Sequence, residues 1–440
     1  MTRESASKTE SFDVVIAGAG IGALTLACYL APLGFRVLIL DKRPSLAPVH
    51  RGELVQPLGL KILEELSLID ELLVAPHTRY QSFDFLDARG RLLMRSHYDR
   101  GDSSFPFALA IEPHQMDQIL ARSLSSHPNI LLRFGSELTG LSVDAQGVEV
   151  TARQENGEST RILARVLVGD DGRHSRVREL SGLGQDNGRI APYRDSYLGG
   201  SLLLPEGDDI SPALRDTTGR YFLGPRSIFF FFSVSDRRRF FLLLLPDSDR
   251  EKFFREGTGP LLARLDTLVP GFSKTAGSQG YDDPDRYHPL PVWKVDLNRW
   301  VRDGVVLMGD AAHAMNPHVA QGRNQAMEDG RVLAPILAKA LLSGARVTRE
   351  DLLGYESLRR PVVRALHRLA DEMTLVWNSG NPLIVAAREA SFRGIGRIPS
   401  LEAKIVTTIG GESIRPLTPL DKLRALAGGL FHSSPPGNSS

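Results

Sequence analysis

VVLMGDAAHAMNPHVAQGRNQAMED, residues 305–329, is the stretch of sequence that decides the fold. Its first three residues are apolar and predict a short buried strand, which ends in the pair Gly309-Asp310. The pair Asn316-Pro317 predicts a turn, and soon afterwards apolar residues recur at helical spacing. A strand therefore delivers an aspartate to a compact loop, and the N-terminus of a helix points back at whatever lies beside that loop.

Asp310 and this helix N-terminus together suggest a type of ligand. An aspartate at a strand end can accept hydrogen bonds from the hydroxyls of a sugar or polyol, and a helix N-terminus stabilises an anion. A flavin suits both features, because it carries a polyol chain and its ring becomes negative on reduction. Taken alone, the stretch fits a plain strand–turn–helix with a capping aspartate equally well, so the interpretation depends on the rest of the chain.

The segment of residues 12–41 has the pattern of a βαβ unit. An apolar run at 12–17 predicts a buried strand, the loop GAGIGA follows at 18–23, and a helix then continues until Gly34 ends it. The loop matches the dinucleotide-binding pattern G-x-G-x-x-A, and a second strand with a terminal acidic residue follows in register. That agreement disfavours the alternative of a glycine-rich turn without a ligand.

Each of these residue types suits dinucleotide binding for a physical reason. Gly18 allows the tight turn, Gly20 lets a pyrophosphate approach the backbone, and Ala23 permits close packing of helix on strand. Asp41 ends the second strand and is placed to accept hydrogen bonds from the hydroxyls of an adenosine ribose. The cofactor contacts expected in this unit are Gly18, Gly20, Gly22, Ala23, Asp41 and Lys42.

Two further segments carry charged residues beside predicted elements. In HRGELVQP, residues 50–57, Arg51 precedes an expected helix and could neutralise a pyrophosphate, and the alternative is a surface arginine on a loop. A strand expected at 165–168 ends in GDDGRHSRVR, residues 169–178.

A β-rich, aromatic region is expected at residues 187–291, with a separate hairpin near 82–94. The runs IFFFFS and FFLLLL flank the charged residues 236–239, which predicts a hairpin with a solvated turn. We expect one face of this hairpin to pack on a helix and the other to line a cavity, and the alternative is that both faces are plain core. Helices are expected at 111–124, at 254–268 and, with breaks at 379–382 and 395–399, over most of the chain after residue 324.

The composition bounds the class of protein. A net charge of +1 gives no basic field for nucleic acid or an acidic membrane. Cys28 is the only cysteine, so no internal disulfide is possible, which fits a reducing cytoplasm. Glycines and Pro32 interrupt the most apolar long stretch, so no integral membrane segment is expected. The histidines lack the paired spacing of a metal site, so no metal is expected.

Three motifs stand in a particular order: GAGIGA with its acidic partner, then GDDGRHSRVR, then GDAAHAMNP followed by QGRN and ED. This order resembles the FAD-dependent aromatic-hydroxylase family of flavoprotein monooxygenases, which has the para-hydroxybenzoate hydroxylase-like fold. The resemblance covers about residues 12–375. Within the family, HRGELVQP looks most like the ubiquinone-biosynthesis hydroxylases and squalene monooxygenase.

The resemblance implies a role for each matching position. Gly18, Gly20 and Asp41 would hold the adenosine half of FAD, and Arg51 would lie over its pyrophosphate. The other implied positions are Asp171 and Gly172 of the DG motif for FAD and the nicotinamide cofactor, Gly309 and Asp310 for the ribityl chain, and Pro317, Gly322 and Asn324 beside the isoalloxazine.

The chain departs from the family pattern at several positions. Val319 and Ala320 stand where the family commonly has two glycines whose backbone passes close to the flavin. Arg323 stands where a small or apolar residue is usual. Pro113 takes the place of an arginine, for which Gln115 would be a weak substitute. We expect Arg323 and Gln115 to contact the cofactor.

The mechanism that the resemblance implies belongs mainly to the cofactor. NAD(P)H reduces FAD, O2 adds at the flavin C4a, and the hydroperoxide passes one oxygen atom to the substrate. Pro317 and His318 are the expected catalytic positions: the helix N-terminus after Pro317 would stabilise the reduced ring, and His318 would line the pocket unless it is a solvent-facing loop histidine. His174, with Arg173 or Arg176, would meet the phosphates of the reductant.

The expected fold is α/β, with a Rossmann-type FAD-binding domain at 1–78, 108–188 and 292–375, an inserted β-rich substrate domain at 79–107 and 189–291, and a helical C-terminal region with a flexible tail at 376–440. The expected function is hydroxylation of an aromatic or polyketide-like small molecule with O2 and NADH or NADPH, in a cytoplasmic monomer or homodimer that binds no nucleic acid. Alternatives are epoxidation of an isoprenoid or polyene, a related flavoenzyme that reduces or halogenates, and a non-catalytic flavin-binding protein.

Overall fold

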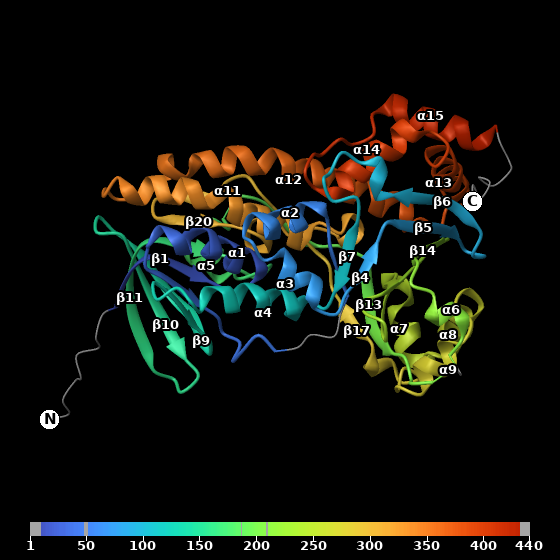
Figure 1. Cartoon of the computed structure of the whole chain (residues 1–440), viewed down its shortest axis with the longest axis horizontal. Coiled ribbons are helices and arrows are strands. Elements are labelled where there is room, and N and C mark those ends of the chain that lie inside the picture. The colour runs from blue at the N-terminus through green and yellow to red at the C-terminus, as the bar shows by residue number, and fades with distance from the viewer. Residues whose placement is uncertain (1–9, 48–51, 186, 208–209, 432–440) are drawn as a thin grey trace.

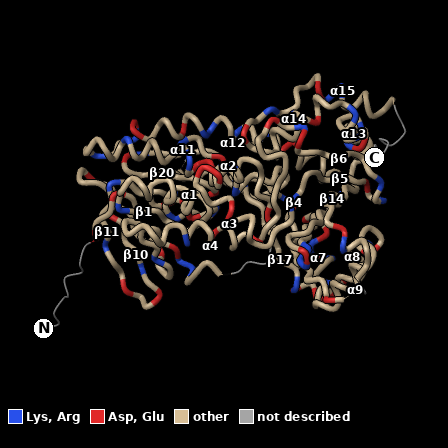
Figure 2. The backbone as a smooth tube through the Cα atoms, in the orientation of Figure 1, with Lys and Arg blue, Asp and Glu red and all other residues tan. Residues whose placement is uncertain are grey.

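The structure, a computed structural model, describes residues 10–47, 52–185, 187–207 and 210–431. Figure 1 shows an elongated molecule with one sheet and its helices at one end, a second sheet with helices at the other end, and the last helices of the chain above the second sheet. Lys and Arg are interspersed with Asp and Glu along the whole trace (Figure 2), in keeping with the net charge of +1. The predicted α/β class is confirmed.

The main sheet has eight strands, with β19-β20-β11-β1-β2-β8 in order, β10 paired to β11, and β9 paired to β10. The bounds are β1 (Glu10–Ala17), β2 (Val37–Leu40), β8 (Ile130–Arg133), β9 (Ser136–Val143), β10 (Val148–Gln154), β11 (Ser159–Gly169), β19 (Val301–Arg302) and β20 (Val305–Leu307). Strand β1 runs parallel to β2 and β11, and β20 runs parallel to β11. The carboxyl ends of these strands therefore meet at one edge, where α/β proteins bind ligands.

The central strands β1 and β11 are apolar toward their carboxyl ends, where both faces of the sheet are covered. Val14, Val15 and Ile16 are all fully buried. Helix α1 (Ile21–Leu30) follows β1 and packs against α4 (Pro113–Leu124) and α11 (Gly322–Leu342). The predicted βαβ unit and the predicted strand at 305–307 are both confirmed.

The second sheet has seven strands in the order β17-β13-β16-β15-β14-β5-β6. The bounds are β5 (Ser82–Asp87), β6 (Leu92–His97), β13 (Ser196–Leu203), β14 (Gly219–Gly224), β15 (Ser227–Ser233), β16 (Arg238–Leu245) and β17 (His288–Leu290). Its parallel pair β14–β5 joins the two separated segments of the chain in one sheet. We keep as a proposal that these segments, 79–107 and 189–291, form an inserted substrate domain.

The phenylalanine-rich hairpin β15–β16 forms as predicted, but its surroundings differ from the prediction. Phe229 and Phe231 pack on helix α9 (Phe272–Gly277), as expected for one face. Phe230 and Phe232 on the other face pack against aromatic rings of neighbouring strands, so they form a second layer behind the cavity wall. The turn is only partly solvated, because Arg239 is buried and donates to the Leu214 and Ser235 carbonyls.

Two predicted helices have different boundaries. The helix predicted at 111–124 begins at Pro113, because Ala108–Ile111 forms a fully buried strand, β7. The helix predicted at 254–268 is two helices, α7 (Asp247–Glu256) and α8 (Gly259–Leu268). Gly257 separates them with φ 79, a backbone conformation that cannot continue a helix.

Two small sheets complete the fold. One contains β3 (Glu53–Val55), β7 and β4 (Thr78–Tyr80), and the other is the pair β12 (Gly188–Pro192) and β18 (Trp293–Leu297).

The chain from Gly322 onward is helical in its described part, with breaks at the glycines and prolines near residues 379–382 and 395–399 as predicted. The remaining helices are η1 (Ala31–Leu33), α2 (Pro57–Glu65), α3 (Ile69–Val74), η2 (Tyr98–Arg100), α5 (Arg176–Leu180), α6 (Pro212–Arg215), η3 (Pro284–Arg286), α10 (Asp310–His313), η4 (Pro317–Val319), α12 (Arg349–Trp377), α13 (Pro382–Ile395), α14 (Pro399–Gly410) and α15 (Pro419–Leu430). None of the helices in the described part of the chain has the length and apolarity needed to cross a bilayer. The tail expected after residue 431 lies outside the described residues.

Candidate cofactor groove and substrate cavity

The loop between β1 and α1 leaves the first turn of α1 open to an anion. Gly20 is the N-cap of α1 and has no side chain with which to cap the free N–H groups of that turn. Gly18 has φ 97, and a Cβ there would lie 2.3 Å from the Asp170 carbonyl oxygen. Glycine is therefore required at Gly18 by the protein itself, and the uncapped helix end fits a pyrophosphate.

Asp41 follows β2 as predicted, but protein donors already occupy its carboxylate. Oδ2 accepts from Ala19 N at 2.7 Å, and Arg43 donates to both oxygens. Burial alone would raise the pKa of Asp41, but these hydrogen bonds from Arg43 and Ala19 hold it below its ordinary value. Arg43 thus shares the expected ribose position with Asp41, and the sequence reasoning missed it. Lys42, between them, is exposed.

Asp170 is a second residue that the sequence reasoning missed. Its Oδ2 accepts from Ala23 N at 2.8 Å, so the carboxylate lies beneath the glycine-rich loop. A Cβ at Gly20 or Gly309 would come within 3.0 or 2.5 Å of the Asp170 carboxylate. Burial raises its pKa well above the ordinary value, and the nearby carboxylate of Asp329 raises it further. The glycines of both motifs therefore leave room for an acid as well as for a ligand.

Asp171, the predicted acid of the DG motif, caps a helix. It accepts from Ser175 Oγ at 2.5 Å, from Arg176 N at 2.6 Å and from Val177 N at 3.0 Å, at the start of α5. Gly172 has φ 82, and a Cβ there would meet nothing within 4 Å among the described residues. The position beside Gly172 is therefore accessible to a ligand.

The segment after the DG motif also ties two loops together. Arg178 is buried and donates to the carbonyls of Ala311 and Arg173, which joins the DG loop to the GD loop. The ring of His174 lies edge-on to Trp293, with centroids 5.1 Å apart. Burial lowers the pKa of His174, and the Arg173 guanidinium lowers it further.

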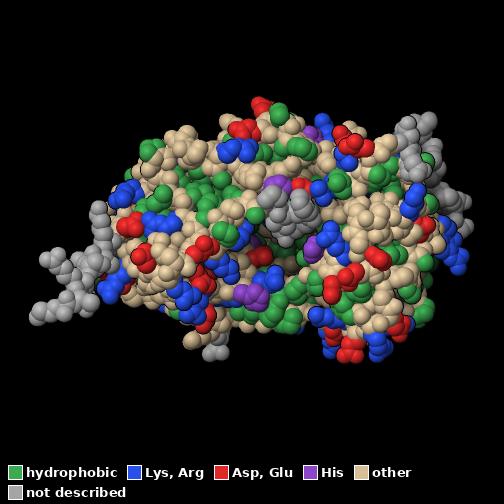
Figure 3. All heavy atoms as spheres, turned by 90° about the horizontal axis from the view of Figure 1, so that it is seen from below, with side chains coloured by type: hydrophobic (Ala, Val, Ile, Leu, Met, Phe, Trp, Pro, Cys, Tyr) green, Lys and Arg blue, Asp and Glu red, His purple; other side chains and the backbone are tan. Residues whose placement is uncertain are grey.

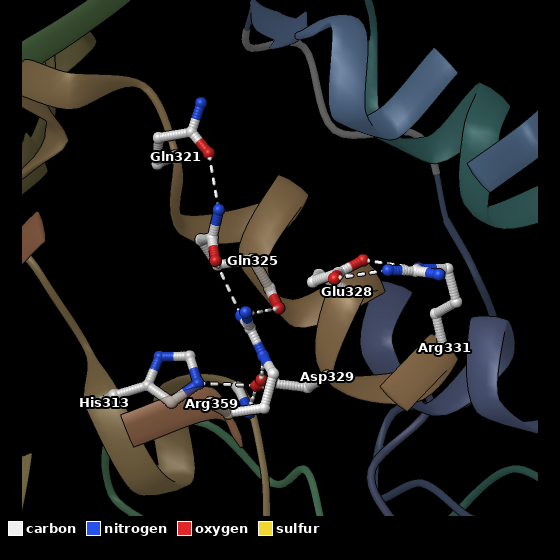
Figure 4. Close-up of polar contacts among 8 residues, drawn as sticks. His313, Gln321, Gln325, Glu328, Asp329, Arg331 and Arg359 are labelled. Carbon is white, nitrogen blue, oxygen red and sulfur yellow. Dashed lines mark hydrogen bonds and ion pairs between the residues drawn. The ribbon is translucent and has the colours of Figure 1, made fainter. Parts of the chain in front are cut away.

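Gly309 and Asp310 form the turn after β20 that the sequence predicts. Gly309 has φ 55, and Asp310 is exposed at the start of α10. Figure 4 shows how this turn is held: the Asp329 carboxylate receives Gly309 N at 2.9 Å, His313 Nε2 at 2.5 Å and Arg359 Nε at 2.7 Å. Attraction to His313 and Arg359 outweighs burial and lowers the pKa of Asp329 to about 2. His313 therefore has a structural role in this turn.

The same polar network reaches the loop expected beside the isoalloxazine. Arg359 donates to Gln325 Oε1 at 2.6 Å, and Gln325 donates to Gln321 Oε1 at 2.9 Å (Figure 4). Gln321 is the N-cap of α11, but its side chain donates to the Ile409 carbonyl of α14. The first N–H groups of α11, starting at Gly322, are consequently left for another acceptor.

Of the two residues that stand in place of glycines, Ala320 is accommodated with backbone strain. Ala320 has φ 48, in the left-handed region that glycine adopts readily. Val319 is buried, and Pro317 begins the short helix η4. Asn324 fixes the loop, because its Oδ1 accepts from Gln56 N at 3.0 Å while its Nδ2 donates to the carbonyls of Leu54 and Ala320.

The remaining predicted contacts are engaged within the protein. Arg323 pairs with Asp117 at 2.5 Å and with Glu53, and their attraction raises its pKa against the effect of burial. Gln115 completes a capping box with Glu112 at the start of α4. Arg51 lies outside the described residues. In Figure 3 the face seen from below is hollowed near its middle, with charged and His side chains around the hollow.

A cavity of about 610 Å³ lies beside the loop of residues 318–320. Its walls come from the loop 318–320, from β5, β6 and β14 of the second sheet, and from helices α12 to α15. The aromatic residues of its lining are Phe83, Phe85, Tyr98, Tyr221, Trp377 and Phe392. No local sequence pattern indicates that the C-terminal helices close this cavity, because that contact depends on tertiary packing alone.

A few polar groups interrupt the apolar lining. Gln56 is fully buried and accepts from the Tyr98 hydroxyl at 2.8 Å, while its Nε2 has no acceptor among the described residues. Gln56 belongs to HRGELVQP, so that motif could have identified it, whereas no signal marks Tyr98. Charged residues of the lining are Arg368, Glu372, Arg388, Arg415 and Lys422.

His318 lies in the cavity wall and is buried, so it does not face solvent. Its Nε2 lies 2.9 Å from the Tyr197 hydroxyl and 3.2 Å from Asn378 Oδ1. Asn378 in turn donates to Asp195 Oδ2 at 2.8 Å. Burial lowers the pKa of His318 to about 4, although Asn378 opposes the shift, so the imidazole is neutral at pH 7.

Comparison with protein families gives one match, to the family described as FAD binding domain, over residues 11–199 and 255–370. Two similar curated proteins are 6-methylpretetramide 4-monooxygenase of Streptomyces rimosus, 28% identical over 88% of this chain and 90% of its own, and ubiquinone hydroxylase UbiL of Rhodospirillum rubrum, 27% identical over 89% and 87%.

Solved structures agree on the fold. The p-nitrophenol 4-monooxygenase PnpA of Pseudomonas putida superposes with a TM-score of 0.76 at 20% identity, covering 92% of this chain and all of its own. PqsL of Pseudomonas aeruginosa in complex with 2-aminobenzoylacetate gives 0.71 at 21% identity, over 89% and 99%.

Proposed function

The chain belongs to the FAD binding domain family of flavoprotein monooxygenases, and on this premise we propose that it is an NAD(P)H-dependent hydroxylase of a large, mainly apolar, aromatic or polyketide-like molecule. The observation that carries the proposal is the cavity of about 610 Å³ against the loop that contains His318. Its volume lies within the range of small-molecule sites. Two relatives are named as a 6-methylpretetramide 4-monooxygenase and a ubiquinone hydroxylase, and these names support the same class of substrate.

The residues at the carboxyl edge of the main sheet fit FAD. The uncapped start of α1 would hold the pyrophosphate, Asp41 with Arg43 would meet the ribose, and Asp310 would meet the ribityl chain. Bound there, FAD would supply the redox chemistry by which two electrons from NAD(P)H and one O2 molecule give a hydroxylated product and one molecule of water. The free N–H groups at Gly322 would stabilise negative charge on the reduced ring.

The protein's own residues would orient the substrate and keep it dry. The aromatic walls exclude water, and Gln56 would donate its unpaired N–H group to a carbonyl or phenolic oxygen. His318 is neutral at pH 7, so its imidazole would be able to accept a hydrogen bond from a phenol. Its contacts with Tyr197 and Asn378 fix the imidazole in the wall. The residues His318 and Gln56 would thus touch the substrate.

The reductant would approach beside the DG motif. His174, Arg173 and the exposed Lys42 lie near one another there, and Trp293 offers an aromatic face beside His174. Positive charge and an aromatic ring suit a dinucleotide. The rate at which NADH or NADPH reduces the bound flavin would distinguish the two reductants.

Epoxidation of a polyene or isoprenoid is the second candidate. The observation that favours it is the mainly apolar surface of the cavity, whose walls contain the aromatic rings of Phe83, Phe85, Tyr98, Tyr221, Trp377 and Phe392. An alkene has no hydroxyl group to offer His318, so this reaction would be indifferent to His318. The location of the inserted oxygen atom distinguishes the two reactions.

The test is the visible spectrum of the purified protein in air, before and after NADPH, with a panel of phenols and polyenes. We expect bound flavin that bleaches, faster with a true substrate, and then recovers, with one labelled oxygen atom from O2 in the product. A protein that binds no flavin even after FAD is added would overturn the proposal. Flavin that dithionite reduces but NADH and NADPH never reduce, with any compound of the panel, would favour a non-catalytic flavin-binding protein.

A further inference from the structure

The cavity beside the loop of residues 318–320 meets solvent at one place. Most of the side chains that line it are buried or half-buried. The exposed ones are Arg368 and Glu372 of α12, Arg415 and Pro416 of the loop between α14 and α15, and Lys422 of α15. Exposed lining residues mark where a cavity opens, so we call these five residues the mouth.

The mouth carries three cations and one acid. Lys422 Nζ lies 2.5 Å from Glu372 Oε1, and Arg415 Nη2 lies 2.9 Å from Asp102 Oδ2, so both of these cations have a counter-charge. Within the described part of the chain, the guanidinium of Arg368 has no ion pair and no hydrogen bond. The mouth therefore has one positive charge that the protein does not neutralise.

The acids that follow Arg368 on α12 are engaged with other partners. Asp371 accepts from Lys294 Nζ and from the Tyr193 hydroxyl, each at 2.6 Å. Glu372 pairs with Lys422 across the mouth. A cation at the edge of an apolar cavity favours an anionic group that is held against it. The ligand, rather than the protein, is therefore the expected source of the missing negative charge.

Helix α12 forms a long wall of the cavity and measures the distance between its two ends. Its lining residues recur at helical spacing and are Ala365, Arg368, Leu369, Glu372, Met373, Val376 and Trp377. The ring of Trp377 lies beside that of His318, with centroids 5.2 Å apart. Arg368 stands nine residues earlier, which is about 14 Å along the helix axis at 1.5 Å per residue. A single aromatic ring cannot span that distance, whereas an extended molecule can.

We propose that the mouth selects an elongated, mainly apolar substrate that carries a carboxylate, which Arg368 binds while the opposite end of the molecule lies near His318. The inference rests on the proposed function, because it takes this cavity as the substrate site. Arginine suits the role, since its planar guanidinium can donate two parallel hydrogen bonds to a carboxylate. The apolar walls supply most of the affinity, and the partly solvated charge pair at the mouth supplies selectivity.

The experiment compares two fluorescent probes that differ by one charged group. Anilinonaphthalenesulfonate carries an anionic sulfonate, which stands in for the carboxylate, and phenylnaphthylamine is the same aromatic body without it. R368Q should weaken binding of the sulfonate about fivefold and leave the neutral probe unchanged. Added salt should reduce the preference for the sulfonate, because an exposed charge pair is screened. The matched control is R424Q, which changes an exposed arginine of α15 outside the cavity lining and should leave both probes unaffected.

Two further variants fix the sign and the place of the effect. E372Q removes the one acid of the mouth, so it should strengthen binding of the sulfonate and leave the neutral probe unchanged. A387W places a ring inside the cavity and should weaken both probes, which assigns them to the cavity rather than to the outer surface. Normal far-ultraviolet circular dichroism should verify that each variant is folded.

The opposite results would overturn the proposal. These are equal losses of the two probes in R368Q, a weaker effect of R368Q than of R424Q, unchanged binding in A387W, or binding of neither probe by the unchanged protein. Probe binding needs no turnover, so it fails separately from the proposed function. A protein that keeps the charge selectivity but hydroxylates nothing would contradict the proposed function alone, and an active hydroxylase without the selectivity would contradict only the role of Arg368.

Discussion

Asp329 Oδ2 lies 2.5 Å from His313 Nε2, while Oδ1 of the same carboxylate accepts from Arg359 Nε at 2.7 Å. All three side chains are buried. The carboxylate also receives Gly309 N, so the acid of α11 holds the turn that presents Asp310. One carboxylate therefore links the turn after β20 to α12.

We predict that D329N destabilises the fold by about 3–5 kcal/mol, because it removes the counter-charge of the buried Arg359 guanidinium and weakens the contact with His313. The free energy of unfolding from urea titration measures this loss. FAD should also bind more weakly, because the Gly309 turn loses its anchor. The matched control is E328Q, the adjacent acid. Its ion pair with Arg331, drawn in Figure 4, is partly exposed and should contribute no more than about 1 kcal/mol. Equal effects of the two changes would contradict the assignment.

A second prediction concerns Asp170. In the unfolded chain its carboxyl ionises near the ordinary value, but burial raises the pKa in the folded state. Stability from this group is therefore present at low pH and falls as pH rises toward the folded pKa. D170N removes that dependence, so it should be more stable than the unchanged protein, by a margin that grows with pH.

The neighbouring residue supplies the control for Asp170. Asp171 caps α5 with three hydrogen bonds, so D171N should lose about 1 kcal/mol where D170N gains stability. Unfolding temperatures of both variants over a range of pH measure the difference. A D170N curve parallel to that of the unchanged protein would show that Asp170 is not the group responsible.

Ala320 provides a prediction about strain. Its φ of 48 costs about 1 kcal/mol for a residue with a Cβ, and glycine removes that cost. A320G should therefore raise stability slightly and leave flavin binding intact. The same change at Ala326, inside α11, should lower stability by about 1 kcal/mol, because glycine weakens a helix. Losses of similar size in both variants, by urea titration, would mean that the loop is not strained.

The sequence was sufficient for the parts of the site that depend on neighbours along the chain. GAGIGA, Asp310 and Pro317 lie at the ends of the elements that their patterns predict. Fixed local geometry explains this, since turns, caps and buried strands depend on a few adjacent residues. The placement of these residues at one edge follows from the parallel register.

The other features depend on contacts between distant segments, which no local pattern records. Asp170 reaches Ala23 across 147 positions, and Gln56 meets Asn324 across 268. The strain at Ala320 was anticipated as a departure from the family, but its φ required the structure. The closure of the cavity by α13 to α15 is of the same kind, because packing of the last helices decides it.

His318 gives a prediction about pH. Its pKa is about 4 in the folded protein, below the ordinary histidine value near 6.5. Protons therefore bind the unfolded state first, so stability falls as pH drops from about 6.5 toward 4. At pH 5 the unchanged protein should have lost about 2 kcal/mol relative to pH 7 that H318Q keeps. Denaturation at both pH values tests this, and equal losses in the two proteins would place the titration elsewhere.

The last prediction concerns Gln56 in the cavity wall. Its Oε1 accepts a hydrogen bond from the Tyr98 hydroxyl, and its Nε2 has no acceptor among the described residues. If the free end donates to a substrate oxygen, Q56L should lower kcat/KM about ten- to a hundredfold, because a polar group on the substrate would lose its partner. Y98F should have a smaller effect, since it releases the amide without removing it. Reduction of the flavin by dithionite should be unchanged in both, which separates orientation of substrate from damage to the cofactor site. Should Q56L turn over a polyene better than a phenol, the epoxidase reading would gain, because an alkene offers Gln56 no oxygen to hold.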